Sequence, residues 1–473
     1  MPINRRIIME SSTVSLSQPS ASHPLQIERR ALLPSFASMA RSHSPDHNGV
    51  GEIRPLAAIR RALYIFLIVA GLAPGGCKED SGNDVALLAA LAAGGGCPSY
   101  DWNLPPGVPA PVVPSDNCMT PARVELGRHL FYDKALSRDE SMSCASCHFQ
   151  ERAFADGKTR PRGIAHAGFP TGELHPRNAQ HLSNAGYHTK LTWNNPLLDT
   201  LEGQSRVPLF SESGDNSIVE LGLQDQQYLN KLASDDTYRQ LFQQAYDGDI
   251  SEQSVRFALA SFQRSMTSFD SDYDRFIKGQ GSLSPAAYRG FEVFNGEVAE
   301  CFHCHGGFNF TDTSLHTNSG AVEFAFHNNG LYSDAEYNSK PTKGLQDISN
   351  QALDRGKFRA PSLRNIVLTM PYFHDGSVNC SSPPADATNR TAMEACAREA
   401  LTVIVDMYRA GGDAAKRGQP TGAAVDASLI RPFSITDSQR DDLVEFLISL
   451  TDWSFASRSD LANPRPSHSR FGR

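Results

Sequence analysis

Two stretches of the sequence share one pattern: CASCH at residues 144–148 and CFHCH at residues 301–305. Cys-x-x-Cys-His is the attachment signature of a c-type haem, in which both thiols bind the porphyrin and the histidine binds the iron. The alternative is a structural zinc site, which needs four clustered ligands, whereas these cysteine pairs lie far apart in the chain. We therefore predict two covalent haems, held by Cys144, Cys147 and His148 and by Cys301, Cys304 and His305.

The composition is that of a globular protein with room for two domains. The chain has 473 residues, of which 40% are hydrophobic and 20% charged, and its net charge is −8. No basic stretch with interleaved aromatic residues occurs, so a nucleic-acid partner is disfavoured. A mildly acidic balance bears on solubility and leaves the function open.

The N-terminal 76 residues differ from the rest and are expected to be a leader. Arg60 and Arg61 precede an apolar run over 62–73. That run is too short to span a bilayer and suits the hydrophobic core of an export signal. Its position some way into the chain suggests a start codon assigned too early. We expect a periplasmic protein.

The five cysteines outside the haem motifs support export. Cys97 with Cys118, and Cys380 with Cys396, can each close a short loop, and an oxidising compartment permits both disulfides. Cys77 is then the odd cysteine, and its context is similar to the lipidated cysteine of a bacterial lipoprotein signal. A lipid anchor at Cys77 and simple cleavage of the leader both stay open.

The sequence predicts an all-α protein of two cytochrome domains, with long loops around the haems. Thr120-Pro121-Ala122 and Ser284-Pro285-Ala286 each read as a helix N-cap followed by proline, and each precedes a Gly-x-x-x-Phe step and a haem motif. Apolar residues at helical spacing over 255–266 and 443–450 indicate two more helices. Long strand patterns are absent. Our boundaries are a leader at 1–76, a tether and Pro-rich lead-in at 77–118, domains at 119–283 and 284–455, and a flexible tail at 456–473.

From about Asn117 to Asp452 the chain resembles the bacterial di-haem cytochrome c peroxidase/MauG superfamily. The motifs that carry the resemblance are ERAFADG at 151–157, APSLRN at 360–365 and PYFHDG at 371–376. Within that superfamily the chain most resembles the MbnH type, through TGELHPRN at 171–178, LTW at 191–193 and CFHCHGGFNF at 301–310. The resemblance implies an enzyme that reacts with hydrogen peroxide at the N-terminal haem, with the C-terminal haem transferring electrons.

The resemblance also implies catalytic roles for three residues. Trp193 matches the tryptophan between the haems, although an ordinary core tryptophan is the alternative. Gln204 and Glu220 match the distal pair above the first iron, where a carboxylate can move a proton between the peroxide oxygens. Glu220 could instead be a solvated helix residue.

Two further positions decide the subtype. His166 lies near the place where some family members carry a histidine that blocks the first iron, and His175 is its rival. On the second iron, the family's distal ligand position falls on Tyr408, with Met407 as its neighbour about 100° away on a helix. A phenolate ligand and a thioether ligand give the iron different chemistry.

The family also holds a calcium ion between its domains, partly through backbone carbonyls. Asn178, Thr369 and Pro371 are the matching positions, and oxygen ligands suit calcium. Carbonyl ligands leave little trace in a sequence.

Three functions follow from these observations. The first is a MauG/MbnH-like enzyme that uses peroxide to oxidise a residue of a partner protein. The second is a cytochrome c peroxidase that receives electrons from a small exported donor protein. The third, disfavoured by Gln204 and Glu220, is a di-haem electron-transfer cytochrome without enzymatic activity.

Overall fold

The first cytochrome domain is built on two helices that cross at a glycine. In the computed structural model, which describes residues 97–166, 169–210, 219–315 and 326–471, α3 (Pro121–Tyr132) packs against α8 (Glu252–Ser265). A Cβ atom at Gly127 would lie 2.0 Å from the carbonyl oxygen of Ala258, so only glycine allows this close approach. Leu126, Leu130 and other apolar residues of both helices form the buried core of this domain.

The second domain repeats the arrangement. Helix α10 (Pro285–Phe294) crosses α16 (Asp437–Ile448), and a Cβ atom at Gly290 would lie 1.9 Å from the carbonyl oxygen of Asp442. Thr120 caps α3 and Ser284 caps α10, each by accepting a hydrogen bond from a backbone amide, as predicted. The close helix contacts at Gly127 and Gly290 explain why the repeated Gly-x-x-x-Phe step begins with glycine.

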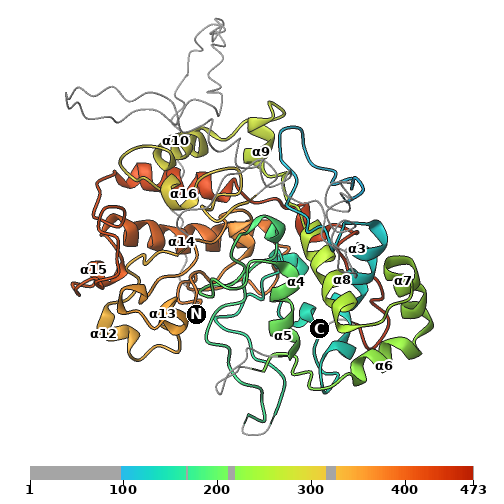
Figure 1. Ribbon diagram of the computed structural model, residues 1–473. Helices are drawn as coiled ribbons and strands as arrows, with labels where there is room; N and C mark the ends of the chain where they lie inside the picture. Colours follow the sequence, from blue (N-terminus) through green and yellow to red (C-terminus); the bar gives the residue numbers. More distant parts are fainter. Residues whose placement is uncertain (1–96, 167–168, 211–218, 316–325, 472–473) are drawn as a thin grey trace, which may run out of the picture. The chain divides into compact units, whose positions relative to one another are not determined.

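The other helices complete the two domains. Figure 1 shows α3, α6, α7 and α8 gathered on one side and α10, α14 and α16 on the other. The remaining α-helices are α4 (Leu201–Gln204), α5 (Arg206–Phe210), α6 (Gln227–Ser234), α7 (Asp236–Tyr246), α9 (Asp272–Ile277), α11 (Phe302–His305), α12 (Asp334–Tyr337), α13 (Gln346–Ser349), α14 (Arg390–Arg409) and α15 (Asp413–Lys416). Among the described residues only isolated β-bridges occur, so the predicted all-α fold is confirmed. None of the helices in this part of the chain is both long and apolar enough to cross a membrane.

Both predicted disulfides are present. Cys97 is bonded to Cys118, and Cys380 is bonded to Cys396 beside the start of α14. The first disulfide ties the Pro-rich lead-in to the residues just before α3. The expected leader and Cys77 lie outside the described residues.

Residues 456–471, expected to form part of a flexible tail, are instead packed on the first domain. Leu461 is 1% exposed and Phe471 is 5% exposed, and both belong to the core that contains α3 and α8. Arg470 forms ion pairs with Asp133 and Asp235. We call residues 456–471 the C-terminal strap. Its apolar residues are sparse and follow no helical period, so local sequence patterns do not predict it.

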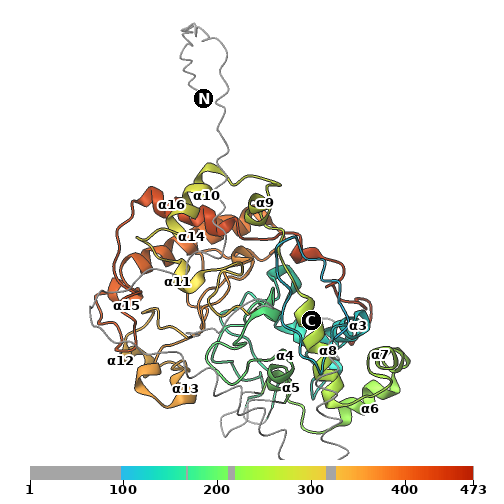
Figure 2. The same cartoon turned by 45° about the horizontal axis from the view of Figure 1, so that its top comes forward.

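The loops between the helices occupy the space between the two helix groups. In both cartoon views the segment from about 155 to 200 runs from the first group toward the second (Figures 1 and 2). Over that stretch the described structure is a single 3-10 turn, Ala185–Tyr187, and irregular chain. Two cavities lie beside these loops. Residues of this segment and of the chain after α11 are part of their lining.

Candidate active site

The first haem motif lies on the wall of a cavity of about 1370 Å³. Cys144, Cys147 and His148 form part of its lining. Gln204, at the end of α4, and Glu220 also line it. The structure therefore brings together the first haem motif and both predicted distal residues, although they lie in three separate segments of the chain.

The orientation of His148 is set by the ERAFADG motif. Its Nδ1 lies 2.6 Å from the carbonyl oxygen of Phe154. A carbonyl can only accept, so Nδ1 carries the proton and Nε2 keeps its lone pair for a metal. Ala153 and Phe154 both have positive φ, at 51° and 64°, and this left-handed turn aims the carbonyl at the ring. Burial lowers the pKa of His148, which keeps the imidazole neutral.

The second haem motif lines a cavity of about 1760 Å³. The Nδ1 of His305 lies 3.1 Å from the carbonyl oxygen of Pro361 and 3.3 Å from that of Phe310. Pro361 belongs to the APSLRN motif, so each of these two family motifs supplies a carbonyl that orients one histidine. Nε2 of His305 is again the nitrogen left for a metal.

The cavities and their thiols fit two covalent haems. Each cavity has both cysteines and the histidine of one haem motif on its wall, so a haem attached to that motif would lie inside it. The four other described cysteines form disulfides, whereas the motif cysteines are free. Burial raises the pKa of each motif thiol to about 12, so the unattached cysteines are protonated near neutral pH. The motif cysteines are Cys144, Cys147, Cys301 and Cys304.

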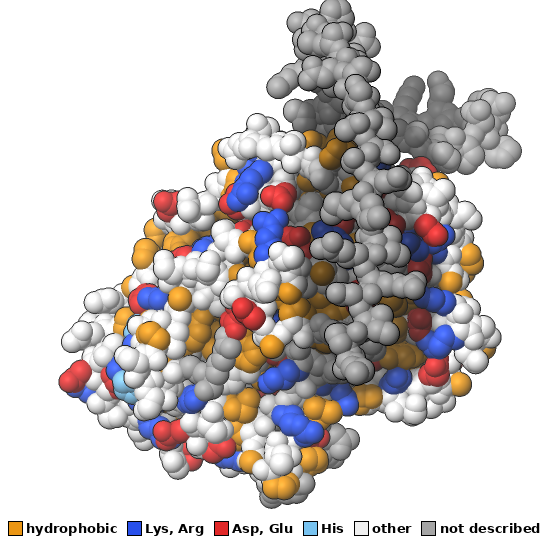
Figure 3. All heavy atoms as spheres, turned by 180° about the vertical axis from the view of Figure 1, so that it is seen from behind, with side chains coloured by type: hydrophobic (Ala, Val, Ile, Leu, Met, Phe, Trp, Pro, Cys, Tyr) orange, Lys and Arg blue, Asp and Glu red, His pale blue; other side chains and the backbone are white. Residues whose placement is uncertain are grey.

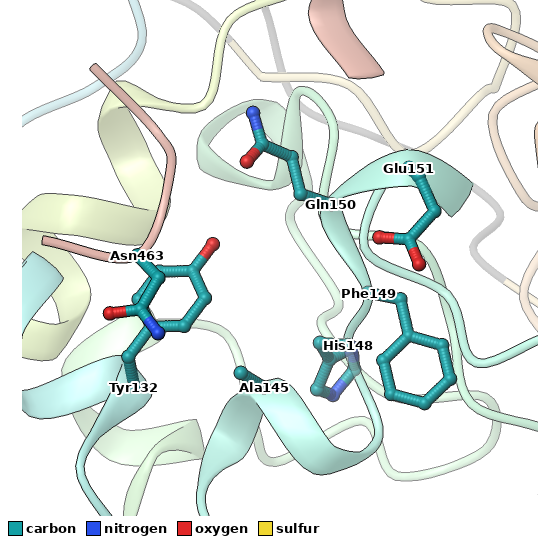
Figure 4. A pocket seen from close by; sticks show the side chains of 7 residues that line it. All are labelled: Tyr132, Ala145, His148, Phe149, Gln150, Glu151 and Asn463. Atoms are coloured by element: carbon teal, nitrogen blue, oxygen red, sulfur yellow. The ribbon is translucent and has the colours of Figure 1, made fainter. Parts of the chain in front are cut away.

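Figure 4 shows a smaller pocket of about 450 Å³ beside His148, on the motif's own loop. Glu151 and Gln150 of the ERAFADG region and Tyr132 at the end of α3 line it. Asn463 of the C-terminal strap closes one side. The strap is fixed there because Tyr132 donates a hydrogen bond to the carbonyl of Leu461 at 2.8 Å.

Glu220 is positioned by the loop that carries the TGELHPRN motif. Oε1 of Glu220 lies 3.5 Å from Nε2 of His175, and the carbonyl of Glu220 accepts a hydrogen bond from the amide of Ile164 at 2.9 Å. Burial, helped by the nearby Arg177, lowers the pKa of His175 to about 3. His175 is therefore neutral near pH 7, and the distal side of the cavity holds one carboxylate beside a neutral imidazole.

Of the two candidate blocking histidines, His175 lines the first cavity. His166 is not among the described residues of that lining. It lies in a short turn, where its amide donates to the carbonyl of Phe169 and its ring is 4.0 Å from Glu173.

Tyr408 and Met407 lie on the same helix, α14, and both contact the apolar cluster around Leu331, but only Tyr408 is in the described lining of the second cavity. Tyr408 lines the second cavity, and its hydroxyl accepts a hydrogen bond from Asn329 at 3.4 Å. Burial raises the pKa of Tyr408 to about 12. Met407 is 2% exposed and packs in the apolar cluster around Leu331.

Trp193 lines both cavities, and its side chain is 7% exposed. Its Nε1 donates a hydrogen bond to the carbonyl of Asn178 at 2.9 Å. The ring is thus held in one orientation between the two haem motifs, at the position that the family resemblance implied.

The three residues expected at a calcium site come together at the second cavity. Asn178, Thr369 and Pro371 all line it. The amide of Asn178 donates to the carbonyl of His374 at 2.7 Å, which joins the two segments. In the described ranges no group of three or more His, Cys, Asp or Glu side chains is arranged to hold a metal ion.

Four polar residues that lie between the two haem motifs were not predicted from the sequence. His181 and Arg359 line both cavities, as does Gln180, while His188 lines the first. Arg359 stands directly before the APSLRN motif, which was its only signal. The motif gave no indication that the arginine is buried.

Comparisons with known proteins agree with this geometry. The family model for di-haem cytochrome c peroxidase matches residues 121–282. A methylamine utilization protein MauG of Methylophilus methylotrophus is 32% identical over 287 residues, covering 59% of this chain and 75% of the relative. Cytochrome-c peroxidase IdrP1 of Denitromonas iodatirespirans is 29% identical, covering 77% of this chain and 91% of the relative. A crystal structure of a MauG-like protein associated with microbial copper homeostasis has a TM-score of 0.67 and 38% identity, covering 77% of this chain and 99% of that chain.

Proposed function

The chain belongs to the di-haem cytochrome c peroxidase/MauG family of oxidoreductases, and on that premise we propose that it uses hydrogen peroxide to oxidise a residue of a partner protein. The family implies two haem c groups, and the cavities around His148 and His305 fit them. When bound, the haem held by His148 would supply the site of reaction with peroxide, and the haem held by His305 would share the oxidising equivalents.

The observation that carries this proposal is the side chain that α14 presents to the second cavity. Tyr408 lines the cavity and Met407 packs away from it. A phenolate is a stronger donor to oxidised iron than a thioether, so it favours a second haem that can hold oxidising equivalents. The hydrogen bond from Asn329 further stabilises the phenolate form.

At the first haem, side chains of the protein transfer a proton from one oxygen of hydrogen peroxide to the other. When bound, the haem iron under His148 supplies the electrons that break the O–O bond of peroxide. Glu220 takes the proton from the near oxygen and delivers it to the far oxygen, which then leaves as water. Gln204 donates a hydrogen bond from its amide to the peroxide, and neutral His175 holds the carboxylate of Glu220 in place.

Trp193 links the two haems in this proposal. Its indole borders both cavities and is fixed by the hydrogen bond to Asn178, so its ring does not need to reorient for electron transfer. A calcium ion bound by the carbonyls of Asn178, Thr369 and Pro371 would hold the same junction between the domains.

The proposed partner is a small exported protein, met in the periplasm. The export signal before Cys77 and the two disulfides support that location, and Cys77 offers a lipid anchor. On the face shown in Figure 3, acidic and basic side chains are interspersed. This face therefore has no continuous positively charged patch of the kind that attracts a nucleic acid.

The second candidate is a cytochrome c peroxidase fed by a donor protein, and the place of His175 favours it. His175 lines the first cavity, where a histidine could block the ferric iron until the second haem is reduced. Several relatives are named cytochrome-c peroxidases.

Stopped-flow mixing separates the two functions. The as-isolated protein, with both irons ferric, is mixed with one equivalent of peroxide. A spectral change within seconds is expected for the proposed function, because no reduction step is needed. If the spectrum changes only after one haem is reduced beforehand, the cytochrome c peroxidase function is correct. His175→Ala is the matched variant: it restores the direct reaction only if His175 is the blocking ligand.

A further inference from the structure

The guanidinium of Arg359 is buried between the two cavities without a negative partner. The residue is 4% exposed. Its Nη1 donates to the carbonyl of Ala360 and to Nδ1 of His188, both at 3.3 Å, and its Nη2 donates to Oε1 of Gln180. Nε has no hydrogen-bond partner among the described residues. Every group that Arg359 contacts is neutral.

Other buried arginines of this chain show the usual arrangement. Arg264 pairs with both carboxylate oxygens of Glu202, at 2.8 and 2.9 Å. Arg364 pairs with Asp274 at 2.9 Å. A buried charge without such a partner is strongly destabilising, so proteins seldom keep one.

The surroundings of Arg359 do not remove its charge or balance it. Burial lowers its pKa to about 10, which still leaves it protonated at neutral pH, and Asp312 offsets only part of that effect. Asp312 is itself paired with His327. Burial also keeps His181 and His188 neutral, with the pKa of His181 lowered to about 4. A charge of +1 therefore remains on this wall.

An anion for Arg359 has to come from one of the cavities. Arg359 lines both of them, and its backbone amide donates to the carbonyl of Trp193 at 2.8 Å, which fixes it to the shared wall. Each haem brings two carboxylates on one edge of the porphyrin. A planar guanidinium suits a carboxylate because it can donate two parallel hydrogen bonds. Nε, which has no partner among the described residues, and the adjacent Nη2 lie on the same edge of the guanidinium and can donate these two hydrogen bonds.

We propose that Arg359 binds a carboxylate of a bound porphyrin at the wall shared by the two cavities, with Gln180 and His188 holding the guanidinium in place. This rests on the two haems that the family implies and is independent of the reaction with peroxide.

The test compares variants of the mature two-haem protein. Arg359→Met removes the charge, and Arg206→Met is the matched control, because Arg206 lies on α5 beside the first cavity but is 61% exposed in its side chain. The readouts are the reduction potential of each haem, from a spectroelectrochemical titration, and the propionate bending modes in resonance Raman spectra.

Removing a positive charge beside a haem favours the ferric state. Arg359→Met is expected to shift the one-electron equilibrium of at least one haem tenfold or more toward ferric, which is about 59 mV, and to move its propionate mode. Arg206→Met should leave the propionate modes unchanged. The haem whose potential and mode move identifies the porphyrin that supplies the carboxylate.

Unchanged potentials and propionate modes in Arg359→Met would overturn the proposal. If that variant does not accumulate with both haems, Arg359→Lys decides, because it keeps the charge but loses the planar fork. A shifted propionate mode in Arg359→Lys supports the carboxylate contact, and an unshifted one rejects it.

Discussion

Replacing Glu220 with glutamine tests the proposed proton transfer. The substitution keeps the size of the side chain and removes its ability to accept a proton from peroxide. General acid–base groups contribute roughly 10²–10⁴-fold to a rate. The side chain of Glu220 is 36% exposed, so water can replace part of its function. We therefore expect a fall of about 100-fold in the rate of reaction with peroxide, equivalent to about 2.7 kcal/mol in the barrier.

The assay is the second-order rate constant for peroxide, measured by stopped-flow absorbance with both haems confirmed in place. Glu173→Gln is the matched control, because Glu173 also faces a histidine, His166, at 4.0 Å, but is not part of the described lining of the first cavity. Equal rates for Glu220→Gln and Glu173→Gln would refute the role of Glu220. A fall in Glu220→Gln that comes with loss of haem would point to a structural role instead.

Four other changes have definite expected outcomes. Tyr408→Phe should alter the low-spin spectrum of the second haem, and Met407→Leu should not; the reverse result would assign the ligand to Met407. Denatured wild-type protein should keep the mass of two haems, whereas Cys147→Ala should lose or weaken the first attachment, as mass spectrometry under denaturing conditions will show. Asp156 is 3% exposed and burial raises its pKa from 3.8 to about 6, so its ionisation destabilises the fold progressively as the pH rises from 3.8 to 6 and by the full amount above 6. Asp156→Asn should therefore stabilise the protein by up to about 3 kcal/mol at pH 8 and have little effect below pH 3.8, measured by denaturant unfolding; equal gains at both pH values would contradict this. Gly127→Ala places a Cβ atom 2.0 Å from the carbonyl of Ala258 and should destabilise the first domain by about 1–3 kcal/mol or more, and a melting temperature equal to wild type would show that α3 can move away from α8.

Features that depend on local chemistry could be predicted from the sequence. The haem motifs, the caps at Thr120 and Ser284, and the pairing of the remaining cysteines each rest on a few neighbouring residues or on short loops. These features follow from side-chain geometry that the rest of the fold does not change.

Features that depend on packing between distant segments were harder to predict. Arg359 looks like an ordinary surface arginine until the loops around residues 180 and 188 cover it. His175, and not His166, is in the described lining of the first cavity. The hydrogen bond from the amide of Ile164 to the carbonyl of Glu220 joins two segments that are distant in the sequence, which no local pattern predicts. The family resemblance placed Trp193, Gln204 and Glu220 near the haem motifs, and their roles stay predictions.

The C-terminal strap makes the first haem pocket depend on residues that lie more than 300 positions further along the chain. Leu461 and Phe471 complete the core around α3 and α8, and Arg470 neutralises Asp133, which is fully buried. Detaching the strap would therefore expose apolar core to water and leave a buried carboxylate without its cation. Because Asn463 also lines the pocket beside His148, the same event would open that pocket to solvent.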